Sequence, residues 1–119
     1  MKRRFRLTGS EECQKARKYG RVVRLPVLVM VYLPVARDFP RIGVVAGRGL
    51  GRAVQRNRAR RLLRHAVKPF IPEIRSGWDI LLIARKPLLQ ATFQEIQDAV
   101  RLALHRSNIL VETDEFAGH

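Results

Sequence analysis

The chain has 119 residues, 46% of them hydrophobic and 7% aromatic, which suits one globular domain with a modest core and excludes wholesale disorder. Its 24 Lys and Arg against 10 Asp and Glu give a formal net charge of +14, and 19 of the cations are Arg. Because the guanidinium group forms bidentate hydrogen bonds with phosphate and stacks on bases, this composition favours a polyanionic partner.

Membrane and secreted classes do not fit the sequence. The longest apolar stretch, 25–36, is interrupted by Pro26 and Pro34, and no run approaches the roughly 20 residues of a spanning helix. Polar residues follow the basic N-terminus directly, so no signal peptide is predicted. Cys13 is the only cysteine, which excludes an internal disulfide and a multi-cysteine zinc site. We therefore expect a cytoplasmic protein with no membrane partner and no small-molecule cofactor.

Hydrophobic periodicity and turn residues predict seven elements. In chain order they are a helix over 11–19, strands over 22–24, 27–33 and 42–46, a helix over 52–68, a strand over 78–84, and a helix that ends near residue 106. Thr8 with Glu11, and Thr92 with Glu95, have the spacing of capping boxes. Glycines predict a flexible loop over 47–51. The order predicts one α+β domain over 1–107, with helices packed on a single small sheet of about four strands, and a frayed tail over 108–119.

Two of the helices carry an apolar stripe at helical spacing, which predicts the face that each buries. In the helix over 52–68 the stripe consists of Ala59, Leu62, Leu63, Ala66, Val67 and Phe70. In the last helix it consists of Phe93, Ile96, Val100, Ala103 and Leu104. In the strand over 78–84, residues 80–83 form an unbroken apolar run, which predicts a buried strand.

The segment 41–68 holds nine basic residues and no Asp or Glu. Opposite its apolar stripe, the helix presents a polar arc made of Asn57, Arg58, Arg60, Arg61, Arg64 and His65. Like charges at such spacing repel and destabilise the helix, so their retention indicates phosphates that relieve the repulsion. Arg56, Asn57 and Arg58 also stand at the helix start, where the helix dipole favours an anion. Nucleic acid is the predicted partner.

Other interpretations of these features are weaker. A solvated helix face normally mixes both signs, and a helix flanked by strands and prolines seldom lies on lipid. Gly47-x-Gly49-x-Gly51 lacks the full spacing of a dinucleotide-binding loop. The three histidines, His65, His105 and His119, have no partners at metal-ligand spacing. Asp79 is expected to have a structural role, either in a turn or as the partner of a nearby Arg. No catalytic residue and no metal-binding residue is therefore predicted.

These segments resemble the signature of the bacterial ribonuclease P protein subunit. The resemblance rests on Arg-Ile-Gly-Val-Val at 41–45, the glycine loop with Gly51, the run 53–64 with its Arg-Asn-Arg start, and Trp-Asp-Ile-Leu-Leu-Ile-Ala-Arg at 78–85. It spans 2–107 with the right order and spacing. It implies a ribosomal-protein-like α+β sandwich with a left-handed βαβ crossover around the basic helix.

The resemblance also implies a function. The family protein is the accessory subunit of a ribozyme, in which a catalytic RNA with Mg²⁺ removes the 5′ leader of precursor tRNA. The expected partners are that RNA and precursor tRNA, and Mg²⁺ is expected on the RNA rather than at a site on this chain. The alternative is a ribosomal or other structural RNA-binding protein with no processing role. A free-standing protein nuclease would need an acid–base or metal constellation, which the sequence lacks.

Two groups of residues are predicted to contact RNA. Those that bind the catalytic RNA are Arg48, Arg52, Arg56, Asn57, Arg58, Arg60, Arg61, Arg64 and Lys68. Those of a leader cleft between the first helix and the sheet are Cys13, Arg17, Val29, Val31 and Val45. Family members often carry aromatic residues in that cleft, where stacking is worth about 1–3 kcal/mol per base. Here the leader is expected to rest on Arg17 and on aliphatic surface.

Overall fold

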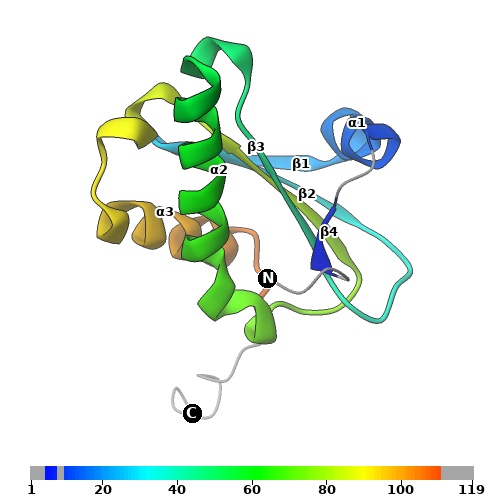
Figure 1. Ribbon diagram of the computed structural model, residues 1–119. Coiled ribbons are helices and arrows are strands. Elements are labelled where there is room, and N and C mark those ends of the chain that lie inside the picture. The colour runs from blue at the N-terminus through cyan, green and yellow to red at the C-terminus, as the bar shows by residue number, and fades with distance from the viewer. Residues whose placement is uncertain (1–4, 8–9, 111–119) are drawn as a thin grey trace.

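The computed structural model describes residues 5–7 and 10–110 and has the predicted α+β architecture (Figure 1). Its main elements are α1 (Ser10–Tyr19), β1 (Arg21–Arg24), β2 (Leu28–Pro34), β3 (Arg41–Val45), α2 (Ala53–Val67), β4 (Trp78–Ala84) and α3 (Phe93–Arg106). Short 3₁₀ helices, which the sequence analysis did not predict, occupy Arg48–Leu50, Lys68–Glu73 and Lys86–Gln90. The predicted order of helices and strands is confirmed.

The strands form one sheet in the order β1-β2-β4-β3. β2 pairs antiparallel with β1 and with β4, whereas β3 and β4 are parallel neighbours, so α2 lies in the crossover between them. The register places Val29 opposite Ile83, and Ile83 opposite Val45, which makes one aliphatic row across three strands. The left hand of the crossover stays a prediction from the resemblance.

The two faces of the sheet are packed differently. α2 and α3 cover one face and enclose the larger core, to which β2 contributes Leu28 and Met30. Because side chains alternate along a strand, Val29 and Val31 point to the opposite face. There α1 packs on β2 and β4 over a smaller core made of Leu7, Ala16, Val31 and Leu81. The face beside α1 is therefore less fully covered than the face under α2 and α3.

The predicted stripes are the buried faces of α2 and α3 with one exception. Eight of the predicted side chains are buried: Ala59, Leu63, Ala66 and Val67 on α2, and Ile96, Val100, Ala103 and Leu104 on α3. Leu62 and Phe70 are half-buried against the same core. Phe93 is 42% exposed, so its predicted burial is wrong. It is the first residue of α3, and the stripe is covered only from Ile96 onward.

Two predicted loop regions differ from the structure. The loop over 47–51 is not simply flexible, because its 3₁₀ helix buries Leu50 in the main core. At the other end of the domain, Ile109 and Leu110 are buried, and Leu110 forms a β-bridge with Ile74. Packing therefore continues past the boundary expected at residue 107. The rest of the predicted tail, 111–119, lies outside the described residues, and so does Thr8 of the predicted Thr8–Glu11 capping box.

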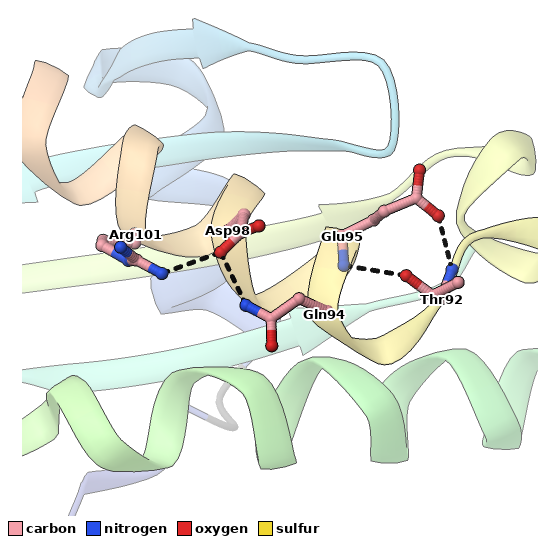
Figure 2. A network of polar contacts seen from close by, with 5 residues as sticks. All are labelled: Thr92, Gln94, Glu95, Asp98 and Arg101. Atoms are coloured by element: carbon pink, nitrogen blue, oxygen red, sulfur yellow. Dashed lines mark hydrogen bonds and ion pairs between the residues drawn. The ribbon is translucent and has the colours of Figure 1, made fainter.

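The capping box predicted for α3 is present (Figure 2). The hydroxyl of Thr92 accepts a hydrogen bond from the backbone N–H of Glu95 at 3.1 Å, and the Glu95 carboxylate accepts one from the backbone N–H of Thr92 at 2.8 Å. One turn further on, the Asp98 carboxylate accepts from Gln94 at 2.9 Å and from Arg101 at 2.7 Å. The first two turns of α3 are thus tied together on their exposed side.

The capping box gives α3 a pH dependence. Hydrogen bonds from the Thr92 backbone, and next from its side chain, hold the pKa of Glu95 below its ordinary value. A lowered folded-state pKa stabilises the helix start fully above the ordinary pKa, and this stabilisation is lost as the pH falls through the lowered value. We expect the hydrogen-exchange protection of the Thr92 amide, which donates to this carboxylate, to fall over that range. Glu95→Gln is the control, and an equal fall in that variant would contradict the prediction.

Candidate nucleic-acid interface

The exposed face of α2 carries a cavity of about 380 Å³ bordered almost entirely by cations. Five of the predicted RNA-binding residues line it: Asn57, Arg60, Arg61, Arg64 and Lys68. Two further residues, Arg6 from the N-terminal segment and His65 from α2, complete the lining. The Arg60 guanidinium donates a hydrogen bond to the Asn57 side-chain oxygen. Among the described residues, those that line this cavity include no carboxylate.

Arg64 is the most strongly perturbed group of this cavity. Partial burial, followed by the charges of Arg6 and Arg60, lowers the pKa of its guanidinium from the ordinary value. The guanidinium still remains protonated at neutral pH, so the three arginines repel one another. A phosphate between them would relieve this repulsion with charge-assisted, bidentate hydrogen bonds. The cavity is therefore suited to an anion with several acceptor oxygens.

The other predicted RNA-binding residues lie at or before the N-terminal half of α2 and do not line the cavity. They are Arg48, Arg52, Arg56 and Arg58. Arg48, Arg52 and Arg58 are exposed, whereas Arg56 is half-buried and its Nε has no hydrogen-bond partner within the described residues. The first turn of α2 contains no acidic residue, so nothing there offsets the positive end of the helix dipole. This end of α2 extends the basic surface of the cavity.

A second cavity, of about 240 Å³, lies between the N-terminal segment, α1 and β3. Of the predicted leader-cleft residues, only Cys13 lines it. Val29 and Val45 are half-buried on the same face of the sheet, beside the smaller core. Val31 is only 4% exposed beneath α1, so it supports this face from below rather than lining an open cleft. Arg17 is exposed on α1 and lines neither cavity.

Arg6 reaches both cavities because the N-terminal segment lies against the edge of β3. Arg6 forms a parallel β-bridge with Ile42, and the backbone N–H of Leu7 donates to the Ile42 carbonyl at 2.9 Å. The segment approaches β3 closely at Gly43, where a Cβ atom would lie 2.8 Å from the Leu7 carbonyl oxygen and 2.8 Å from a methyl group of Leu81. Sequence reasoning did not place Arg6 in the site, since the approach depends on tertiary packing.

Gly43→Ala should therefore destabilise the protein by about 1–3 kcal/mol, because the added methyl group meets backbone on one side and the core on the other. Urea unfolding followed by circular dichroism measures this loss. Gly49→Ala is the matched control, since a Cβ at Gly49 meets nothing within 4 Å. Equal effects of the two substitutions would show that contact with the N-terminal segment is not the cause.

The described part of the chain contains no group of three or more His, Cys, Asp or Glu side chains that could hold a metal ion. Asp79 is buried and is paired with Arg37 at 2.6 Å, which is one of the two structural roles predicted for it. Within the same residues, no helix has the length and apolarity to cross a membrane. The chemistry that the structure does offer is that of clustered hydrogen-bond donors with positive charge.

The fold and the arginine-lined face of α2 together define a small basic α+β domain built to bind a polyanion. A sequence model described as Ribonuclease P matches residues 1–108, and the chain belongs to this family. It is 41% identical to the ribonuclease P protein component of Roseiflexus sp. (strain RS-1) over 115 residues, which are 96% of this chain and 94% of that protein.

Solved structures agree with this assignment. A mutant of the Staphylococcus aureus RNase P protein is similar with a TM-score of 0.82 at 26% identity, over 90% of this chain and 91% of the other. The RNase P protein from Thermotoga maritima gives a TM-score of 0.73 at 25% identity, over 82% of this chain and 94% of the other. These findings support the role of a ribonuclease P protein component rather than that of a ribosomal or other structural RNA-binding protein.

Proposed function

We propose that this chain binds the catalytic RNA of ribonuclease P through the exposed face of α2 and contacts the 5′ leader of precursor tRNA beside α1. The observation that carries the proposal is the α2 cavity, whose lining combines four arginines with Asn57, His65 and Lys68. Guanidinium groups donate hydrogen bonds to phosphate oxygens in a fixed fork, and the neighbouring amide and imidazole can also contact base edges. The proposal places the protein in the cytoplasm with its substrate.

In this proposal the protein acts by position and charge, while hydrolysis takes place on the RNA subunit with its Mg²⁺ ions. Neutralising RNA phosphates lets two polyanions, the catalytic RNA and the precursor, approach each other. The protonated arginines of α2 have no acceptor or base function at neutral pH, so their contribution is to hold phosphates in place. Leader contact beside α1 would add affinity for the precursor over the mature product, which has no leader.

A cleavage assay tests the function directly. Precursor tRNA is incubated at low Mg²⁺ with a bacterial ribonuclease P RNA, with and without this protein. We expect the protein to stimulate cleavage at the mature 5′ end and to cleave nothing by itself. Tight, salt-sensitive RNA binding without stimulation would instead favour a structural RNA-binding role. Cleavage by the protein alone would overturn the assignment of the chemistry to the RNA.

Leader contact beside α1 predicts that a negative charge on that face of the sheet weakens binding of the precursor. Val29→Glu places a carboxylate in the half-buried row beside α1, where it would repel the leader phosphates. We expect the assembled enzyme to lose roughly tenfold of its affinity for a precursor with a long leader, about the size of one lost base contact. Affinity for a precursor with a single leader nucleotide should not change. Equilibrium binding to the two precursors measures the difference.

Leu102→Glu is the matched control for this substitution. Leu102 is a partly exposed apolar residue on α3, which covers the other face of the sheet. It therefore receives the same charge far from the proposed leader path. Val29→Thr keeps the side-chain shape and reports any loss of folding. An equal loss with Leu102→Glu, or with the short-leader precursor, would contradict leader contact at this face.

A further inference from the structure

The α2 cavity and the cavity beside α1 share two lining residues. Arg6 and Arg64 line both the cavity on the face of α2 and the cavity beside α1. The two residues come from different elements, since Arg6 lies in the N-terminal segment and Arg64 in the C-terminal half of α2. The basic surface of α2 therefore continues into the cleft beside α1, and the passage between them is lined by two guanidinium groups.

Contacts within the fold hold the backbone at each arginine in place. The backbone around Arg6 is bound to β3 through Ile42, which sets the segment beside the sheet edge. Arg64 extends from the helix turn that buries Leu63 in the core, so its backbone cannot shift without disturbing that core. The two side chains thus approach the junction from elements that are each held by separate contacts. Because the two backbones are already held in place, binding an anion needs to order only the two side chains.

The charge at the junction is not balanced within the protein. Partial burial, and then the charges of Arg6 and Arg60, lower the pKa of the Arg64 guanidinium. The residues that line the smaller cavity, of those described, bring no acidic side chain to the pair. Two cations held close together in this way attract a phosphate more strongly than either would alone.

We propose that Arg6 and Arg64 together bind one backbone phosphate of the precursor leader, at the point where the leader passes from the cleft beside α1 to the RNA-covered face of α2. This inference rests on the proposed function and deepens it. It assigns to Arg6 a role in substrate positioning, and it makes Arg64 part of both RNA-binding surfaces. The remaining α2 arginines then serve the catalytic RNA alone.

The test compares Arg6→Ala and Arg64→Ala with Arg61→Ala, which removes an arginine that lines only the α2 cavity. Two quantities are measured: the affinity for the catalytic RNA, and the ratio of the affinities of the assembled enzyme for long-leader and single-nucleotide-leader precursors. The ratio of precursor affinities is measured with protein in excess over the catalytic RNA, so that every variant is fully assembled. Arg101→Ala removes an exposed arginine of α3 and controls for the loss of one positive charge.

We expect Arg6→Ala and Arg64→Ala each to lower the leader-dependent ratio and the affinity for the catalytic RNA by roughly tenfold, as for one lost charge-assisted hydrogen bond. Arg61→Ala should lower only the affinity for the catalytic RNA, and Arg101→Ala neither quantity. Because the two arginines share one phosphate, the double variant should lose less of the ratio than the two single losses combined. Arg64→Lys keeps the charge but loses the bidentate hydrogen bonding of the guanidinium, and it should retain part of the leader-dependent ratio.

A leader-dependent ratio that is unchanged in both Arg6→Ala and Arg64→Ala would overturn the inference, as would an equal fall in Arg61→Ala. Circular dichroism of the free variants checks that each is folded, and Arg6 is exposed, so its truncation should leave the fold intact. Failure of the proposed function itself has a different signature. In that case the wild-type protein would not stimulate cleavage, and no leader-dependent ratio would be measurable in any variant.

Discussion

Replacing Arg58 and Arg61 together by Glu should lower the affinity for the catalytic RNA at least a hundredfold, to order of magnitude, at physiological salt. Both side chains are exposed on α2, and Arg61 lines the cavity. Each substitution removes a charge-assisted contact with phosphate and brings a carboxylate to the same place. Titration of labelled catalytic RNA with the variant, followed by fluorescence anisotropy, measures the loss.

The same substitutions should act on the free protein in the opposite direction. In the double variant the two Glu side chains repel each other as the two arginines did, but the Glu at 61 lies one turn from Arg64, where repulsion becomes attraction, so the total repulsion along the helix decreases. We therefore expect the melting temperature of the free protein to stay constant or rise. A variant that bound RNA weakly because it was unfolded would melt at a lower temperature, so the two causes are separated.

Arg101→Glu with Arg106→Glu is the control for net charge. Both residues are exposed on α3, and the double variant changes the formal charge of the chain by the same amount. If binding depended only on the overall charge, the two double variants would lose affinity equally. A loss confined to the α2 variant shows instead that the RNA contacts that helix.

The two faces of α2 could be predicted because the order of residues along the helix determines both. The stripe from Ala59 to Val67 recurs at helical spacing, and the arginines occupy the positions between its members, so period and composition together identify the buried and the exposed face. The capping box at Thr92 is a local pattern of the same kind. Features of this sort involve neighbours in sequence and do not depend on how the elements pack.

The residues that the sequence analysis missed, or placed wrongly, depend on tertiary packing. Arg6 reaches the site only because its segment lies against β3 at Gly43, and no spacing along the chain signals that approach. Val31 has the alternation of a cleft-facing residue, but α1 lies over it. Leu50 anchors a loop whose glycines suggested flexibility. In each case the position of a second element, rather than the residue itself, determines exposure.

Salt should have a large effect on assembly with the catalytic RNA. If about six phosphates are neutralised, the logarithm of the affinity falls against the logarithm of salt concentration with a slope of about −4 to −5, because bound counterions are released. Between about 50 and 200 mM monovalent salt this corresponds to a loss of roughly 250- to 1,000-fold. Binding isotherms at constant Mg²⁺ over that range give the slope.

The slope also identifies which arginines contact phosphate, since each lost phosphate contact should reduce it by about 1. Arg61→Ala should therefore flatten the dependence, whereas Arg101→Ala, which removes an exposed α3 side chain paired with Asp98, should leave it unchanged. Val29→Glu tests the separation of the two surfaces, because a change on the leader face should not alter the salt dependence of binding to the catalytic RNA. A slope near zero in the wild-type protein would mean that base or shape contacts, rather than the cations of α2, hold the two molecules together.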